Sequence, residues 1–316
     1  MASPNSTVSE ALSAATNKYL TEGGFKDNIF RFPKLLSLYK ANGAYKTEDG
    51  GVMLQVPLMY ATNPTVTSAN PYDSIALTQD EIATSATYSW AQWQGAMVMS
   101  KMELFQNSGE SRLINLMEAK RKALEMTVSQ DLNDALFTGN TSKVTNCMGL
   151  DQLVEATGTV GNIDSSTQSW WRSTVNSSGT ALSETLMETS FLNAYNNIDL
   201  PDIAVTTQTL YGKYMDLTRA KLALNSIPNA QLAELGFESA SFKGKPVVYD
   251  ASCASGDFYW LNWEDIALYY GEGFDMAVSP QNELPAQHVF AWKLIWIGQQ
   301  AVNSRRMHGR MRGKTT

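Results

Sequence analysis

Cysteine and histidine are scarce in this sequence. Its 316 residues include two cysteines, Cys147 and Cys253, and two histidines, His288 and His308. Cysteines this far apart do not form a disulfide framework, so we expect a reducing compartment. The histidines and cysteines show no metal-ligand spacing, and we expect no metal and no cofactor. We interpret His288 as a satisfied residue at a strand end and His308 as a solvated one.

Signatures of catalysis are also missing. No Gly-x-Ser-x-Gly elbow is present, and Gly271-Glu272-Gly273 lacks the third glycine, the helix and the lysine of a phosphate loop. Six carboxylates occur where we expect turns and strand ends, which favours backbone roles over general acid–base catalysis. These are Asp199, Asp202, Asp250, Asp257, Glu264 and Asp265. We expect no enzyme, although a Ser-His-Asp triad is spatial, so a soluble hydrolase stays an alternative.

Long apolar runs are absent too. No window reaches the ~18 uninterrupted apolar residues that a membrane-spanning helix needs. The first thirty residues lack the basic start and apolar core of a secretory signal. We therefore expect a soluble protein that is made inside the cell, and 43% hydrophobic residues predict that it folds. No fixed-period repeat and no linker divides the chain, which predicts one folding unit.

Charge of one sign is missing from two regions. Residues 51–100 contain no Lys or Arg, and no acid follows Glu283. The net charge of -7 argues against a protein whose whole surface binds nucleic acid. The end of the chain nevertheless predicts a local basic tail. Its members are Lys293, Arg305, Arg306, Arg310, Arg312 and Lys314.

An alternating stretch predicts a long hairpin over residues 51–100. The residues Val52, Leu54, Val56, Leu58 and Tyr60 recur with a period of two, which is typical of a strand, and Pro57 places this strand at an edge or a bulge. We expect residues 83–100 as its partner and residues 62–82 as a turn-rich tip. A lone hairpin is marginal in water, so it should lie on a neighbour. The candidate inter-subunit contacts are Pro57, Tyr88, Trp90 and Trp93.

A single long amphipathic helix is predicted over residues 109–138. One face carries Leu113, Met117, Leu124, Val128, Leu132 and Ala135, and the opposite face carries Glu118, Lys122, Glu125, Ser129 and Asn133. Gly139 ends the run, where a left-handed residue is wanted. A helix of roughly 40 Å is longer than a small domain needs.

The remaining segments predict a mixed α/β arrangement. A short helix over residues 8–20 lies in a segment too poor in large apolar residues to form its own core. Trp170 and Trp171 anchor a loop-rich connection over residues 141–179, and helices are expected at 182–196 and 208–224. Strands are expected at 203–205, 242–249 and 258–262, with another short segment at 264–270. A long strand that is buried on both faces over much of its length is expected at 288–302.

This order of elements, together with three late segments, resembles the major capsid proteins of tailed bacteriophages, whose Hong-Kong-ninety-seven-type fold is shared with encapsulins. The segments are FKGKPVVYD (Phe242 to Asp250), GDFYWLNWEDIALYY (Gly256 to Tyr270) and WIGQQAVNSRRMHGRM (Trp296 to Met311). The resemblance implies an α+β capsid fold with an N-terminal arm at residues 1–46 and an extended loop at 47–100. It also implies a peripheral domain at 101–198 with spine helix 109–138, an axial domain at 199–280, and a terminal strand and basic tail at 281–316.

The resemblance implies a structural function. The chain would form hexamers and pentamers of an icosahedral virion shell around double-stranded DNA, assembled in the host cytoplasm with a portal protein and a separate scaffolding protein. Some relatives link subunits through a lysine of the extended loop, which residues 51–100 do not contain, so we expect a non-covalent shell or a cement protein. An encapsulin-type compartment is the alternative with the same fold.

The basic tail has two interpretations within this picture. Its cations could contact packaged DNA without sequence specificity. Alternatively, they form ion pairs with the acidic loop or the spine helix of an adjoining subunit, which we favour because a shell that grips its genome would hinder ejection.

Overall fold

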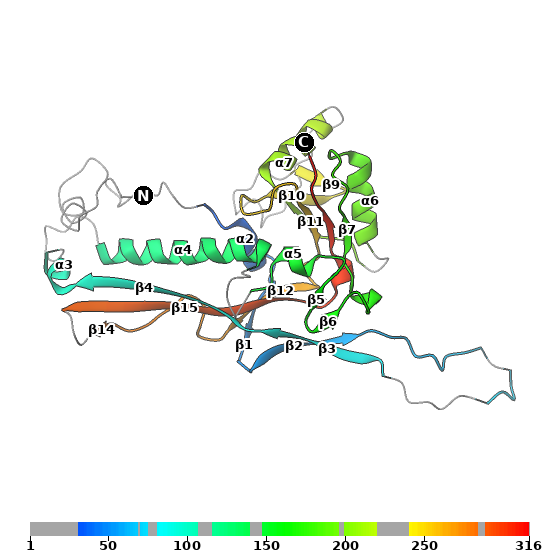
Figure 1. Cartoon of the computed structure of the whole chain (residues 1–316), viewed down its shortest axis with the longest axis horizontal. Helices are drawn as coiled ribbons and strands as arrows, with labels where there is room; N and C mark the ends of the chain where they lie inside the picture. Colours follow the sequence, from blue (N-terminus) through cyan, green and yellow to red (C-terminus); the bar gives the residue numbers. More distant parts are fainter. Residues whose placement is uncertain are drawn as a thin grey trace.

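The long strand expected near the end of the chain is β15, Val289–Val302, and a six-stranded sheet is built around it (Figure 1). The computed structural model describes residues 31–68, 70–74, 81–106, 116–139, 147–195, 199–219, 240–283 and 288–315. One edge of β15 pairs antiparallel with β4, Ala91–Ser100. Its other edge pairs with β12, Ile266–Gly271, then β13, Ala277–Val278, and β14, Asn282–Glu283. Strand β1, Tyr45–Glu48, adds to β12 in parallel.

A second six-stranded sheet has the order β7-β16-β11-β8-β10-β9. Its central strands are β8, Ile203–Thr206, and β11, Phe258–Leu261, and every residue of both is buried. The others are β7, Thr174–Asn176; β9, Ala240–Phe242; β10, Lys245–Tyr249; and β16, Gly309–Met311. Helices α6, Glu184–Ala194, and α7, Gln208–Arg219, pack on this sheet and form a core of their own with it. Ser183 caps α6 by accepting a hydrogen bond from the Leu186 main-chain N–H.

The hairpin is built from β2, Met53–Met59, and β3, Ala83–Ser89, which pair antiparallel over their full length. The prediction of a strand at 52–60 is confirmed, but the expected partner at 83–100 is correct only for its first half. After Trp90 the chain leaves the hairpin and continues as β4 beside β15. All ten residues of β4 therefore pair with β15, in a sheet that helix α4 covers on one face. A free two-stranded hairpin would have no such cover.

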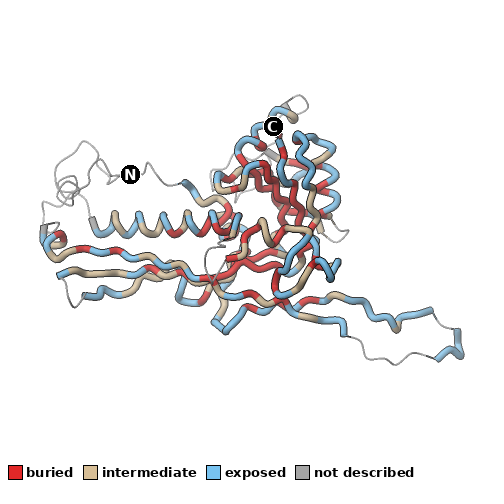
Figure 2. Tube along the Cα trace, in the orientation of Figure 1, coloured by how far each residue is buried: buried red, intermediate tan, exposed pale blue. Residues whose placement is uncertain are grey.

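The predicted long helix is present as α4, Leu116–Thr138, and a helix of 23 residues spans ~34 Å. Residues 109–115, including Leu113, lie outside the described residues. The second half of α4 is buried through Val128, Leu132 and Ala135, whereas Met117 in the first half is exposed. Figure 2 shows this change of burial along the helix. Helix α3, Lys101–Gln106, precedes it.

One assignment on this helix is wrong. We expected Asn133 on the solvent face, but it is buried and binds two other parts of the chain. Its side-chain oxygen accepts a hydrogen bond from the Leu36 N–H at 3.1 Å, and its amide nitrogen donates to Asp250. Asp250 in turn accepts from the Leu35 N–H at 3.0 Å. The first turn of α2, Lys34–Ala41, is therefore capped by residues far away in sequence.

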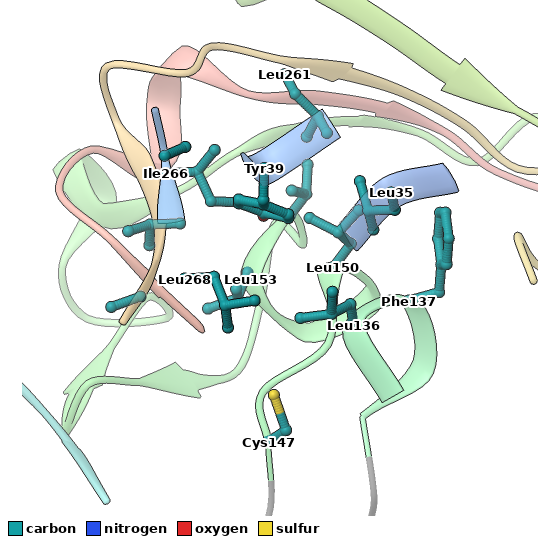
Figure 3. Close-up of a cluster of buried hydrophobic side chains, with 14 of the residues drawn as sticks. Leu35, Tyr39, Leu136, Phe137, Cys147, Leu150, Leu153, Leu261, Ile266 and Leu268 are labelled. Atoms are coloured by element: carbon teal, nitrogen blue, oxygen red, sulfur yellow. The ribbon is translucent and has the colours of Figure 1, made fainter. Parts of the chain in front are cut away.

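The main core lies where α2, the end of α4 and α5, Leu150–Leu153, meet β11 and β12 (Figure 3). Leu35, Tyr39, Leu136 and Leu268 are fully buried there, and each such side chain contributes about 1.5–3 kcal/mol. The Tyr39 hydroxyl accepts a hydrogen bond from Gln300 at 2.7 Å. Residues 34–46, expected as part of an arm that reaches a neighbour, are therefore part of this chain's own core. The helix expected at 8–20 lies outside the described residues.

The sheets do not follow the domain boundaries expected from the resemblance. Strands β12 and β13, inside residues 199–280, belong to the sheet around β15. Strand β16, in the terminal segment, and β7, in residues 101–198, belong to the other sheet. The strand expected over 242–249 is a hairpin of β9 and β10 that turns at Lys243-Gly244, where both residues have positive φ. The helix at 182–196 and the strands at 203–205 and 258–262 are confirmed within a residue or two.

Candidate functional site

Among the described residues, eight of the fourteen large exposed apolar side chains lie toward opposite ends of the molecule. At one end they lie on the outer part of the hairpin, and at the other they lie on β4, α3 and the start of α4. The first group is Met59, Val66, Tyr72 and Ile82, and the second is Val98, Met102, Phe105 and Met117. Figure 1 places the hairpin and α3 far apart. Exposed apolar surface of this kind marks contacts with other molecules.

The base of the hairpin packs on the chain's own core. Leu54, Val56 and Leu58 are buried on one face of β2, and Ala86 and Tyr88 continue this face on β3. The short hairpin of β5, Thr159–Val160, and β6, Ile163–Asp164, covers them. Its turn lies so close that a Cβ on Gly161 would approach the Ala86 Cβ to 2.6 Å. The expectation that the hairpin needs a neighbour is therefore wrong for its base, because the chain itself covers that face.

Pro57 lies on a free edge, as the sequence predicts. The Tyr60 N–H donates to the Ile82 carbonyl at 3.1 Å, and this pair continues the register in which Pro57 is opposite Ser85. Antiparallel hydrogen bonds alternate along a strand, so residues 54, 56, 58 and 60 point their N–H groups at β3 and the nitrogen of Pro57 points away. Proline thus removes one donor from an edge that is otherwise open to strand addition.

The three aromatic contact candidates pack within the chain. Tyr88 is only 1% exposed, and its hydroxyl donates to the Val302 carbonyl at 3.2 Å, so the inter-subunit assignment of Tyr88 is wrong. Trp93 meets Trp296 edge-to-face at a centroid distance of 5.5 Å. The Trp90 indole donates to the Gly51 carbonyl at 2.9 Å. Both are half-buried on the main core, so the argument that only a partner could bury them fails.

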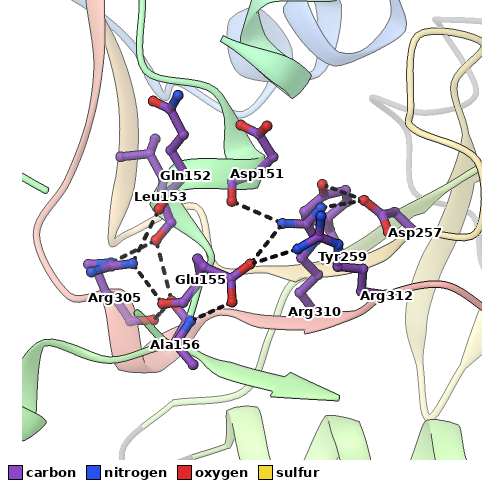
Figure 4. A network of polar contacts seen from close by, with 11 residues as sticks. Asp151, Gln152, Leu153, Glu155, Ala156, Asp257, Tyr259, Arg305, Arg310 and Arg312 are labelled. Carbon is purple, nitrogen blue, oxygen red and sulfur yellow. Dashed lines mark hydrogen bonds and ion pairs between the residues drawn. The ribbon is translucent and has the colours of Figure 1, made fainter. Parts of the chain in front are cut away.

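The expected basic tail is largely an interior structure (Figure 4). Arg305, in the 3-10 helix η2, Arg305–Met307, is 0% exposed and donates to four main-chain carbonyls. Its Nε reaches the Leu153 oxygen at 2.8 Å, and its Nη atoms reach the oxygens of Gln152, Glu155 and Trp171 at 2.7 to 3.2 Å. Two of these carbonyls end helix α5, so Arg305 acts as a C-terminal cap from the other end of the chain. Burial lowers the pKa of Arg305 to about 10, and it keeps its charge at neutral pH.

Two more cations of the tail are also buried. Arg310 donates to Asp257 at 2.6 Å, to the Asp151 carbonyl at 2.9 Å and to Glu155 at 3.4 Å. Burial opposes its charge, yet the Tyr259 hydroxyl and Asp257 leave the pKa of Arg310 raised. The Lys314 ammonium donates to Asn176 at 2.8 Å and to Ser178. Arg305, Arg310 and Lys314 are therefore not available to DNA or to a neighbouring subunit.

Only part of the predicted basic surface stays accessible. Lys293, Arg306 and Arg312 are exposed, and Arg312 lies 3.6 Å from Glu155 of the same chain. All three residues of β16 are buried, so the alternation of apolar and charged residues gave no sign that Arg310 turns inward. Both earlier interpretations of the tail now apply to its exposed cations alone.

The candidate catalytic groups have structural contacts. His308, expected to be solvated, is fully buried, accepts a hydrogen bond from the Asn262 N–H at 3.3 Å, and has a pKa lowered to about 4 by burial. Asp202 accepts from Lys245 at 3.0 Å and Asp250 caps α2. His288 is exposed just before β15, at a strand end as expected. No cluster of metal-ligating side chains and no helix able to span a membrane occurs among the described residues.

Comparison with known proteins identifies the fold. No protein-family model and no curated protein matches the sequence significantly. A chain of the capsid asymmetric unit of cyanophage A-1(L) matches with a TM-score of 0.71 and 18% identity, over 95% of this chain and 97% of that one. The capsid of the Myoviridae phage XM1 matches with a TM-score of 0.58 and 12% identity, over 94% and 96%.

An encapsulin shares the same architecture. The holo-SrpI encapsulin complex from Synechococcus elongatus PCC 7942 matches with a TM-score of 0.63 and 8% identity, over 96% of this chain and 94% of that one. Because these likenesses extend over nearly the whole length of each chain, the expected capsid-type fold is confirmed. This chain has the α+β fold of phage major capsid proteins and encapsulins.

Proposed function

We propose that this chain, which has the fold of phage major capsid proteins and encapsulins, is the major capsid protein of a tailed bacteriophage. Its function is structural, and it carries out no catalysis. Many copies associate as hexamers and pentamers of an icosahedral shell around double-stranded DNA. The likeness to capsid chains of cyanophage A-1(L) and phage XM1 supports this assignment.

The observation that carries the proposal is the pair of exposed apolar surfaces at opposite ends of one chain. A monomer gains nothing from exposing Val66 and Met102, which are 81% and 64% exposed. Two different surfaces on one subunit favour head-to-tail contacts, which close into rings when the rotation between copies permits. Each subunit then buries moderate area with several neighbours, and closure of the assembly adds to the stability of every contact.

The segments take the roles that the fold suggests. The hairpin of β2 and β3 is the extended loop that reaches a neighbour, α4 is the spine helix of the peripheral domain, and the sheet around β8 and β11 is the axial domain. Portal and scaffolding proteins are expected partners, and assembly takes place in the host cytoplasm. Residues 51–100 contain no lysine, which favours a shell held by burial alone or with a cement protein.

An encapsulin-type compartment is the second candidate, because the SrpI encapsulin has the same fold. The phage assignment is favoured because the A-1(L) capsid chain has both the higher TM-score and the higher identity. The two candidates differ in content, which is nucleic acid for a phage head and a protein cargo for an encapsulin.

Negative-stain electron microscopy of the purified protein tests the proposal. We expect closed shells, and nuclease-protected double-stranded DNA inside those taken from the natural source. Shells filled with a second protein would favour the encapsulin candidate. A protein that stays monomeric at high concentration, with and without co-expressed scaffold, would contradict both.

The absence of covalent links is tested by boiling the shells in detergent. We expect a single band at the size of one chain after electrophoresis. A ladder of linked chains would show that subunits are joined by a chemistry that does not use a lysine of residues 51–100.

A further inference from the structure

A pocket of about 350 Å³ opens beside the hairpin, where β2 ends. Residues 57–60 form one wall, Trp170 and Trp171 of the 3-10 helix η1, Ser169–Trp171, form another, and Asn303, Ser304, Arg306 and Met307 form the third. Its volume is at the small end of the ~300–1,000 Å³ range of binding pockets, which suits one large side chain. None of the described residues that line it is acidic.

The pocket combines an aromatic wall with one available cation. Trp170 stacks on Tyr60 with a centroid distance of 5.5 Å and an interplanar angle of 25°. The Trp170 indole donates to Gln168 at 2.8 Å, which holds the ring in place. Arg306 is exposed and forms no ion pair among the described residues, unlike Arg310 four residues later, although its charge acts on the more distant Asp265 carboxyl. The pocket therefore fits an aromatic or apolar side chain next to a carboxylate.

The tip of the hairpin presents that combination. Tyr72 is 101% exposed and precedes Asp73. Residues 70–73 form a closed turn, because the Asp73 N–H donates to the Asn70 carbonyl at 3.0 Å and the Asn70 N–H donates to the Asp73 carboxylate at 2.7 Å. Pro71 stands at the second position of the turn, where its fixed φ is favourable. A turn ordered in advance loses little entropy on binding.

We propose that the turn at residues 70–73 of one copy docks into the Arg306 pocket of a second copy. Tyr72 lies against Trp170 and Tyr60, and the Asp73 carboxylate pairs with the Arg306 guanidinium. The proposal rests on the proposed function and names the two surfaces that meet in one contact between neighbouring subunits of the shell. Charge supports the match, since residues 51–100 carry acids and no Lys or Arg, whereas the pocket carries a cation and no acid.

The pocket receives another copy's turn rather than its own. Figure 1 shows the described residues that follow β2, up to residue 74, leading away from the body, while the pocket lies at the end of β2. The contact is thus heterologous, with a knob on one surface and a receptor on another, and it can be repeated around a ring. In this arrangement the Asp73 carboxylate, which accepts from the Asn70 N–H within its own turn, gains a cationic partner on assembly.

Disulfide trapping in assembled shells tests the proposal. Tyr72→Cys combined with Asn303→Cys places one thiol on the turn and one at an exposed position of the pocket wall, and both natural cysteines are buried. A bond forms only where the two Cα atoms come within about 7 Å. We expect a ladder of linked chains on a non-reducing gel that disappears on reduction. Asp73→Cys with Arg306→Cys is a second pair, and because both residues are exposed, the substitutions leave the packing of the core unchanged.

The control is Val66→Cys with Asn303→Cys, since Val66 is exposed on the same connection but outside the turn. Ladders from the two turn pairs and not from this control support the proposal. A link within one chain, a link to a different protein, or intact shells without any link would each overturn it. Wild-type protein that forms no shells counts against the proposed function instead, and this is seen before any variant is made.

Charge exchange gives an independent readout. Arg306→Asp and Asp73→Arg should each raise the concentration needed for assembly by about threefold to tenfold, and the double variant should return close to wild type. Single variants that assemble like wild type, or a double variant no better than either single one, would refute the ion pair.

Discussion

Replacing Arg305 by methionine should destabilise the chain severely, although the residue lies in a segment that the sequence presents as a charged tail. The substitution keeps an unbranched apolar stem and removes the Arg305 hydrogen bonds to four main-chain carbonyls, those of Gln152, Leu153, Glu155 and Trp171. Only the longer bonds from Ser173, at 3.4 Å, remain to the Leu153 and Glu155 oxygens. Each buried carbonyl left without a donor costs about 1–3 kcal/mol. The bonds to Leu153 and Trp171 are buried, and those to Gln152 and Glu155 are partly so.

The variant also avoids the cost of burying a guanidinium, which offsets part of this loss. We therefore expect the free energy of unfolding to fall by about 3–5 kcal/mol, a large share of the ~5–15 kcal/mol of a typical protein. Arg305→Lys should lose nearly as much, because a single ammonium cannot reach carbonyls spread around a planar fork. Arg305 is charged in the folded protein at neutral pH, since its pKa is about 10.

Urea unfolding of unassembled chains, followed by tryptophan fluorescence, measures the effect. Arg306→Met is the matched control, because Arg306 lies in the same 3-10 helix and is exposed. We expect Arg306→Met to stay within about 0.5 kcal/mol of wild type. Equal midpoints for Arg305→Met and Arg306→Met would refute the claim that Arg305 caps α5 from the interior.

Three further predictions follow from buried polar groups and from the free edge. Asp250→Ala should cost about 1–3 kcal/mol in the same assay, since it removes the acceptor for the Leu35 N–H, whereas an unchanged midpoint would refute this cap. Burial raises the pKa of Asp151 from 3.8 to about 6 against the attraction of Arg310, so the folded state binds this proton more tightly than the unfolded state. Wild type should therefore gain stability relative to Asp151→Asn as the pH falls from about 7.5 to about 5, and parallel pH profiles would contradict the shift. Pro57→Thr restores an N–H on the outer edge of β2 and should increase irregular aggregates in light scattering and microscopy, and assembly as clean as wild type would show that the proline does not protect this edge.

Local periodicity predicted most of the elements. The alternation in residues 52–60 and 288–302 follows from the pleat of a strand with one or both faces buried, and β2 and β15 confirm it. The helical spacing after residue 109 likewise predicts α4, and Pro57 was correctly placed at an edge. These properties belong to a few consecutive residues, so no knowledge of distant partners is needed.

Pairing between distant segments was beyond such reasoning. Nothing in residues 83–100 says that the strand changes partner at Trp90, because the composition of both β3 and β4 is typical of strands and does not name the neighbour. Asn133 has a polar side chain on what reads as a solvent face, yet the first turn of α2 needs an acceptor there. The sequence shows that a residue is polar, but not whether water or another segment satisfies it.

The end of the chain shows the division most clearly. Composition alone determined that residues 305–314 are rich in cations and that the chain as a whole is acidic. Only the tertiary structure decided that Arg305, Arg310 and Lys314 turn inward, while Arg306 and Arg312 stay at the surface. Burying a cation is favourable only where carbonyls or carboxylates already surround it, and here they come from residues 151–178 and 257. That arrangement exists only once segments 53 to 159 positions away have folded beside the tail.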